Sequence, residues 1–361
     1  MILLGATLLT GTTLFAQDSA KTAAPTPNPF SFSGYVEAYY QYDFNKPKDN
    51  NRPGFIYSHN RHNEFNLNLG FLKGSYNTEK VRANLAIAAG SYMNANYAAE
   101  TGVLKNVLEA NAGLKISKKK NLWVDVGIFS SHVGFESAIS KDCWTLTRSI
   151  LADNSPYFES GAKLTYTSNN NKWVASGLVL NGWQRIKRVD ANSLMSYGTQ
   201  LQYKPNTTTT FNYSTFIGTD KPDSARLWRY FHNVYGIFNV TSKFGITAGF
   251  DIGSEQRTKR SSDFNTWYSP VLILKYAVSP KFAIAARGEY YSDKKGVIIA
   301  SGTPNGFQTA GYSLNLDYAP IPNAVIRLEV RSLKSKDDVF TKGNDVTNNN
   351  TFITSSIAVS F

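Results

Sequence analysis

The chain has 361 residues, of which 42 % are apolar, 14 % aromatic and 18 % charged. It is too aromatic for a disordered chain and too polar for a bundle of membrane-spanning helices, and its abundant Tyr and Phe favour β-strands. The formal net charge of +12 would suit nucleic-acid binding. An exported protein rarely meets nucleic acid, so we expect anionic lipids and anionic solutes as partners and no nucleic acid.

The N-terminal residues predict export. Residues 1–16, MILLGATLLTGTTLFA, have the apolar core and small final residue of a signal peptide, which we expect to be truncated because its basic start is missing. A membrane anchor is the alternative, but the run is shorter than the ~18 apolar residues of a spanning helix. Residues 17–31, rich in Ala, Thr and Pro, predict a flexible tail.

From residue 32 onward the chain repeats one pattern, about ten alternating polar and apolar residues followed by a turn. Successive side chains of a strand point to opposite faces, so each repeat predicts a strand with one apolar and one polar face. About sixteen strands are expected, near residues 32–44, 62–76, 81–94, 104–117, 121–129, 157–167, 172–183, 195–204, 208–218, 230–241, 244–256, 265–277, 281–292, 307–319, 323–334 and 351–361.

The connections between these segments alternate in length. Turns of two to four residues, such as 77–80 and 279–280, alternate with longer loops at 45–61, 95–103, 130–156, 184–194, 219–229, 257–264, 293–306 and 335–350. This pattern is typical of outer-membrane barrels, with short periplasmic turns and long extracellular loops. Because lipid does not tolerate open sheet edges, residues 32–361 predict an all-β fold, a single closed antiparallel transmembrane β-barrel around a water-filled channel.

The two faces of the strands predict a lipid side and a pore side, although ordinary strand packing is the alternative for each residue. The expected lipid face includes Phe65, Leu67, Leu69, Val81, Ala83, Leu85, Ile87, Leu122, Val124, Val126, Ile128, Ile246, Ala248, Phe250, Ile252, Leu272, Leu274, Leu314 and Leu316. The expected pore wall carries Glu37, Glu64, Arg82, Asp125, Glu159, Lys163, Arg287, Glu289, Arg327, Glu329 and Arg331.

The longest connection, residues 130–156, is partly apolar and charged, which is typical of a functional loop. We expect it to fold into the barrel and narrow it, or, as the alternative, to cap the rim from outside. Its charges, Glu136, Lys141, Asp142, Arg148 and Asp153, would project into the aperture, with Arg287, Arg327 and Arg331 as partners across the lumen. Small wall residues would make room for the loop, because Gly permits close backbone approach: Ala86, Ala88, Gly90, Gly113, Gly127 and Gly161.

The last segment alternates and ends in Phe361. A terminal aromatic residue on such a strand resembles the signal read by the barrel-assembly machinery, so we expect that machinery as a partner.

Four blocks together are similar to a known family: GYVEAYYQYDFN (residues 34–45), RHNEFNLNLG (61–70), GFESAISKDCWTLTRSI (134–150) and ESGAKLTY (159–166). They resemble the OmpL-like β-barrel porins (porin-2 type) of Gram-negative outer membranes over residues 32–361. The resemblance implies an outer-membrane channel. By fold-level analogy, the third long loop of sixteen-stranded diffusion porins forms the constriction, and residues 130–156 are the third long loop here.

Catalytic chemistry is not evident in the sequence. Of the four histidines, His132 follows Ser130 and Ser131, but neighbours on a strand point to opposite faces, so we expect a polar rim residue. His59 and His62 have no further ligands at a metal-site spacing, and no cofactor site is expected. A barrel enzyme is therefore a weaker alternative, and a barrel subunit of a secretion or uptake complex stays open.

These observations predict a porin, a passive channel for small hydrophilic solutes, in the outer membrane, with a homo-trimer left open. The loops and lumen carry an excess of basic residues, which predicts a weak anion preference: Arg52, Arg61, Arg185, Lys187, Arg188, Arg226, Arg229, Arg257, Lys259 and Arg260. The alternative is that these charges bind lipopolysaccharide phosphates.

Overall fold

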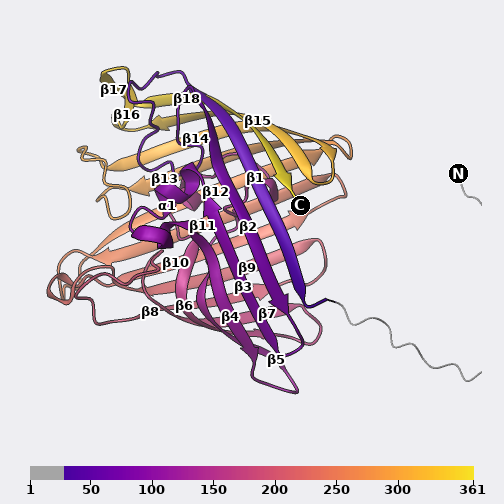
Figure 1. Cartoon of the computed structure of the whole chain (residues 1–361). Coiled ribbons are helices and arrows are strands. Elements are labelled where there is room, and N and C mark those ends of the chain that lie inside the picture. Colours follow the sequence, from indigo (N-terminus) through magenta and orange to yellow (C-terminus); the bar gives the residue numbers. More distant parts are fainter. Residues whose placement is uncertain (1–27) are drawn as a thin grey trace, which may run out of the picture.

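In the computed structural model, which describes residues 28–361, sixteen antiparallel strands form one closed barrel (Figure 1). Each strand pairs with its neighbours in sequence, and β1 closes the ring against β18. The barrel strands are β1 (Phe30–Asp43), β2 (Phe65–Asn77), β3 (Val81–Ala89), β4 (Val107–Lys115), β5 (Asn121–Ser130), β6 (Phe158–Thr167), β7 (Trp173–Leu180), β8 (Ser196–Tyr203), β9 (Thr209–Gly218), β10 (Arg229–Asn239), β11 (Phe244–Gln256), β12 (Phe264–Ala277), β13 (Phe282–Asp293), β14 (Phe307–Ile321), β15 (Ala324–Ser335) and β18 (Asn349–Ser360). The predicted fold class is confirmed.

Two predictions concern the N-terminus of the chain. The expected signal peptide and most of the expected tail lie outside the described residues, and β1 begins at Phe30, inside the segment expected to be tail.

The connections contain short elements: α1 (Ser91–Asn96), η1 (Gly102–Asn106), η2 (Ser140–Asp142), α2 (Ile150–Asp153), η3 (Asp223–Ala225) and the hairpin β16 (Phe340–Lys342) with β17 (Asp345–Thr347). None of the described helices is both long and apolar enough to cross a membrane. The expected strand 81–94 is five residues too long. It ends before Gly90, whose φ of 131° suits only glycine and whose Cα approaches the Asn68 carbonyl so closely that a Cβ would lie 2.4 Å from the oxygen.

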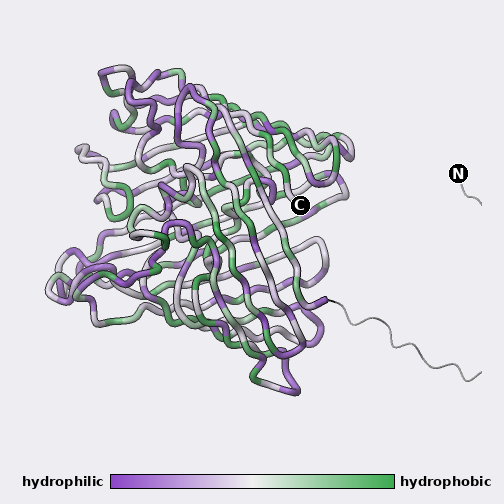
Figure 2. The backbone as a smooth tube through the Cα atoms, viewed as in Figure 1, coloured by the Kyte–Doolittle hydropathy of each residue, from purple (hydrophilic) through white to green (hydrophobic). Residues whose placement is uncertain are grey.

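The long loops and the short turns lie at opposite ends of the barrel. In Figure 1 the long loops lie on the left, and the C-terminus lies on the right, where the chain enters β1. Green and purple alternate along many strands in Figure 2, whereas the loops on the left are largely purple. The lipid-facing prediction holds for residues such as Phe65 and Leu314, which are 88 % and 60 % exposed.

Two residues of the expected lipid face are buried instead. The pairing of β1 with β2 passes from Glu37↔Leu69 to Ala38↔Leu67, so a bulge at Asn68 turns Leu69 inward and leaves it 0 % exposed. Ile128 follows Gly127, whose φ of 127° interrupts the alternation of β5, and it is buried in an apolar cluster with Tyr92.

Candidate functional site

Residues 130–156, termed the constriction loop for the role proposed for them, lie inside the ring of strands and are fixed to the wall opposite their origin. Arg327 of β15 donates hydrogen bonds to the carbonyl oxygens of Ser140 (2.5 Å), Cys143 (3.1 Å) and Thr145 (3.3 Å). Its guanidinium also pairs with Asp317 at 2.7 Å. One buried arginine thus satisfies three loop carbonyls that have no strand partner, which is the role its five donors suit.

Two further arginines bind the second half of the loop. Arg287 donates to the Thr147 carbonyl at 2.6 Å, and Arg331 donates to the Arg148 carbonyl at 2.8 Å. Their counter-ions also hold the loop, because Glu329 accepts the Thr147 N–H at 2.5 Å and Glu289 accepts the Ile150 N–H at 2.7 Å. The wall therefore offers donors and acceptors matched to one stretch of irregular backbone.

The loop's own charges have different roles from those expected. Arg148 is 0 % exposed and donates to the carbonyls of Ser137 (2.5 Å), Leu146 (2.7 Å) and Ala138 (3.0 Å). It closes the loop on itself and does not project into an aperture.

Two of the loop's three acidic residues, Glu136 and Asp153, are also buried and do not project into an aperture. Glu136 accepts hydrogen bonds from the backbone and hydroxyl of Ser149, and burial raises its pKa against the opposing effect of Arg287. Asp153 is 4 % exposed and accepts one long hydrogen bond, 3.4 Å, from Ser58. Only Lys141 and Asp142 keep exposed side chains, and they pair with each other at 3.4 Å.

His132 fixes the start of the constriction loop and corrects the expectation of a rim residue, since it is 5 % exposed. Its Nδ1 lies 2.8 Å from Glu159 Oε2, and its Nε2 lies 2.8 Å from the Thr215 carbonyl oxygen. A carboxylate and a carbonyl both accept, so the site suits a ring whose two nitrogens both donate, which is the imidazolium form. The His132 carbonyl in turn accepts from Ser214 at 2.7 Å and from Gln200 at 3.1 Å.

The glycines that make room for the loop are not the expected ones. A Cβ on Gly113 would meet Asp125 and Arg82 of the wall, and a Cβ on Gly90, Gly127 or Gly161 would meet backbone carbonyls of adjacent strands. These four glycines therefore allow close packing within the barrel wall and do not make room for the loop.

Glycines of β8 and β11 take that role. A Cβ on Gly198 would lie 2.6 Å from the His132 ring, one on Gly245 2.6 Å from Trp144, and one on Gly249 2.1 Å from Phe135. The alternation of residues along β8 and β11 predicts that these glycines face the lumen. The sequence carries no signal for the part of the wall that the loop contacts. Of the expected alanines, Ala86 lines a cavity beside the loop and Ala88 packs in a cluster with Ala138 and Ile139.

The remaining wall charges are mostly paired with each other. Arg82 binds Asp125, and Lys163 lies 4.5 Å from the centre of the Phe129 ring. Glu64 lies just before β2 and pairs with Arg61 at 2.9 Å, so it belongs to the rim.

A second inward segment was not predicted. Residues 44–64, the first loop, bring His59 to 3.3 Å from Glu37 deep in the barrel, with both side chains 0 % exposed. Asn154 of the constriction loop donates to the Phe55 carbonyl at 3.0 Å, so the two loops are joined. The two loops together fill much of the lumen.

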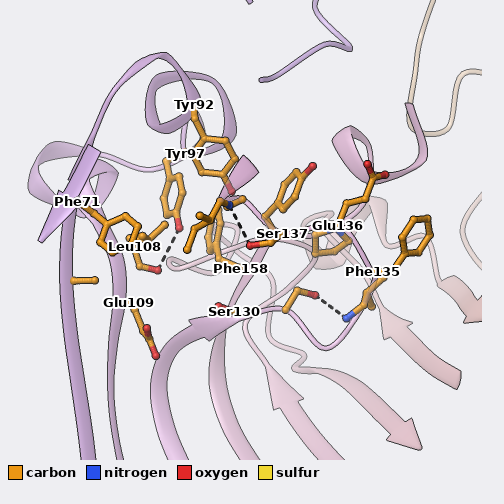
Figure 3. Close-up of a pocket in the computed structure, with 18 of the residues that line it drawn as sticks. Phe71, Tyr92, Tyr97, Leu108, Glu109, Ser130, Phe135, Glu136, Ser137 and Phe158 are labelled. Atoms are coloured by element: carbon orange, nitrogen blue, oxygen red, sulfur yellow. Dashed lines mark hydrogen bonds between the residues drawn. The ribbon is translucent and has the colours of Figure 1, made fainter. Parts of the chain in front are cut away.

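Several cavities border the two loops, and two of them flank the constriction loop. The turn-side cavity, about 350 Å³, is lined by the first part of the constriction loop and by the facing wall, including Phe71, Leu108 and Glu109 (Figure 3). The loop-side cavity, about 300 Å³, is lined by loop residues, including Asp153 and Arg185. The rings of Tyr97 and Phe158 stack with their centres 3.9 Å apart, and both rings line the turn-side cavity. Residues of α1 and of the end of the constriction loop line both cavities.

Comparisons with known proteins agree with this architecture. The family described as beta-barrel porin-2, OmpL-like, matches residues 29–361, and no curated protein matches the chain. Among solved structures, the Salmonella typhi OmpF complex with daunomycin is 9 % identical over 92 % of this chain and 97 % of that chain, with a TM-score of 0.60.

Two other solved structures are similar to the same extent. An anion-selective porin from Comamonas acidovorans is 11 % identical over 92 % of this chain and 99 % of that chain, with a TM-score of 0.59. The trimer form of in-vitro-folded OmpT from Vibrio cholerae is 8 % identical over 92 % and 99 %, with a TM-score of 0.57. At these identities the likeness is one of fold.

Proposed function

Because the chain belongs to the OmpL-like β-barrel porin-2 family and therefore to the outer membrane, we propose that it is a passive channel for small hydrophilic solutes. The observation that carries this proposal is the constriction loop, a stretch of irregular backbone held inside a closed sixteen-strand barrel by Arg287, Arg327 and Arg331. Irregular backbone at membrane depth is tolerated only where it is buried in protein or lines a cavity. A loop fixed in this way narrows a pore that sixteen strands would otherwise leave wide.

The narrowing sets the expected size of the solutes. Cavities of about 300 and 350 Å³ admit small molecules but not folded proteins or large oligosaccharides. The proposal is tested by swelling of liposomes that contain the purified protein, in solutes of graded size. We expect rates that fall steeply from small polyols to disaccharides, and equal rates for empty and protein-containing liposomes would contradict the proposal.

We also propose a weak anion preference. The inward-facing Arg287, Arg327 and Arg331 are each paired with carboxylates, so they add little net charge. About half of the surplus of positive charge lies in the loops at the mouth, for example where Arg257, Lys259 and Arg260 follow β11, and the rest lies in the short turns, for example at Lys118, Lys119 and Lys120. Like-signed charge at a mouth raises the local concentration of counter-ions. Binding of these residues to lipopolysaccharide phosphates is the alternative.

Finally, we propose that the barrel assembles as a homo-trimer. The support is the shared fold with an OmpT structure described as a trimer. The mass of the purified complex in mild detergent tests this, and a purely monomeric mass would contradict it.

A further inference from the structure

The loop-side cavity contains three polar groups that have no protein partner matching their chemistry. Asp153 is nine-tenths buried, and among residues 28–361 it forms no ion pair and accepts only the long hydrogen bond from Ser58. Arg185 is half-buried at the same cavity and likewise forms no ion pair or hydrogen bond within the described residues. Buried charges are normally paired, so the free carboxylate of Asp153 calls for an explanation, and the unpaired guanidinium of Arg185 lies at the same space.

A third group adds an acceptor. Asn96 is 5 % exposed and lines the cavity, and its Oδ1 is buried without a partner, although its Nδ2 donates to the Tyr92 carbonyl at 3.3 Å. An unpaired buried amide oxygen costs free energy unless a ligand donor reaches it.

The other charges of the cavity are already engaged with each other. Arg229 pairs with Glu255 at 2.7 Å and approaches Asp220 at 3.7 Å, and Asp220 also accepts the Trp183 N–H at 3.0 Å. This leaves Asp153 and Arg185 as the two unmatched charges, one of each sign, within about 300 Å³.

We propose that the loop-side cavity is a binding site for a small zwitterion, an α-amino acid or a dipeptide, whose ammonium group binds Asp153 and Asn96 and whose carboxylate binds Arg185. An ammonium group needs oxygen acceptors, which Asp153 and the Asn96 amide oxygen supply, and a carboxylate is matched by a guanidinium fork. Trp183, Val297 and Ile298 also line the cavity and offer apolar surface to the ligand's side chain. The site lies on the loop side of the constriction, so it would select solutes before they pass; in this respect it rests on the proposed channel function.

The neutral form of Asp153 is tolerated by the fold, which makes the test feasible. Burial raises the pKa of Asp153 to about 7, with Glu136 raising it further and Arg331, Arg148 and Arg287 opposing this shift. Asp153→Asn, which has the same shape and no charge, should therefore fold.

The experiment is calorimetric titration of the purified full chain in detergent with L-leucine, L-leucinamide and N-acetyl-L-leucine at pH 8. We expect L-leucine to bind, and each compound that lacks one charge to bind at least about tenfold more weakly, as expected for loss of a charged hydrogen bond. Asp153→Asn should weaken L-leucine and L-leucinamide binding, whereas Arg185→Gln should weaken L-leucine and N-acetyl-L-leucine binding. Arg188→Gln, at an exposed position outside the cavity, is the matched control and should leave all three unchanged.

Two results would overturn the zwitterion site. One is the absence of L-leucine binding, and the other is L-leucine binding that neither Asp153→Asn nor Arg185→Gln weakens. Ion conductance of the same preparations in potassium chloride is measured in parallel. Conductance without L-leucine binding rejects the site and keeps the channel, and absence of conductance rejects the channel itself.

Discussion

At the scale of single residues, His132 fixes the start of the constriction loop to the barrel wall through its contacts with Glu159 and Thr215. Burial alone would lower the pKa of His132, but the Glu159 carboxylate and the hydrogen bonds to Glu159 and Thr215 outweigh burial, and Lys163 opposes them, so the pKa is raised overall. A histidine with a raised folded pKa contributes stability that is fully present below its unfolded pKa of about 6.5 and is lost as pH rises through the folded value.

We therefore expect the melting temperature of the purified protein to fall between pH 6 and pH 9 by more in the native chain than in His132→Gln, which cannot titrate there. At pH 6 the variant should be destabilised by about 1–3 kcal/mol, the cost of a lost charged hydrogen bond. His232, exposed on β10, is the matched control, and His232→Gln should keep the native pH profile. Parallel pH profiles for the native chain and His132→Gln would refute this role.

The sequence could predict which wall side chains point toward the lumen, but it could not predict which groups they bind. Alternation alone correctly turned Arg287, Arg327 and Arg331 toward the lumen, because neighbouring strand residues point to opposite faces. Arg327, however, binds carbonyls more than 180 residues away, at Ser140 and Cys143. Periodicity carries no information about such contacts. Of the three arginines expected to be partners of the loop's charges across the lumen, Arg287 does approach Glu136 at 3.8 Å, but all three mainly hold loop backbone.

At the scale of elements, the strands were predictable and the loops were not. Repeated alternation identified all sixteen barrel strands, and errors arose where one residue broke the period, at Gly90 and at the bulge of Asn68. The inward course of the first loop had no such signal, because its buried residues, such as Phe55 and His59, follow no strand or helix period.

The path of the constriction loop over β11 can be tested at Gly249. A side chain there would occupy the space of the Phe135 ring, whose centre lies 5.6 Å from that of Tyr235. We expect Gly249→Val to displace Phe135 and to change the single-channel conductance. The current should also fluctuate more, because the loop loses its packing contact with β11. Gly288→Val is the control, since Gly288 on β13 is exposed with open space around its Cα. Equal conductance in the native chain and Gly249→Val would place the loop elsewhere.

At the scale of the whole molecule, the barrel closes where its two ends meet. Gly34 N–H donates to the Phe361 carbonyl at 2.7 Å, and Phe361 N–H donates to the Gly34 carbonyl at 3.0 Å. The Phe361 ring lies over Gly34, where a Cβ would approach it to 2.3 Å, and the residue is 67 % exposed on the outer surface beside Phe32 and Leu72.

We expect deletion of Phe361 to slow membrane insertion and lower the yield of folded barrel, because the closing seam loses two hydrogen bonds and an apolar contact. Channels that do insert should conduct as the native protein does, since the Phe361 side chain lies on the outer surface of the barrel. The fraction of heat-modifiable protein in isolated outer membranes measures the yield, with deletion of the exposed rim residue Asp190 as a control. An undiminished yield would reject the role of Phe361 in assembly.

The surplus of positive charge at the mouth predicts ion selectivity of the assembled channel. In a salt gradient at low ionic strength, the reversal potential should indicate weak anion preference, and the preference should fade at high salt as screening shortens the reach of the charges. A triple change of Arg257, Lys259 and Arg260 to Gln should reduce it. Cation preference of the native protein at low salt would contradict the prediction.

The central claim, that the constriction loop narrows the barrel, is tested most directly by single-channel conductance in planar bilayers after residues 136–152 are replaced by a short Gly/Ser link. The barrel strands keep all their pairings in this variant, because the replaced residues belong to no strand. We predict small, ohmic steps for the native protein and clearly larger steps for the variant. Unchanged conductance in a variant that still inserts would contradict the account.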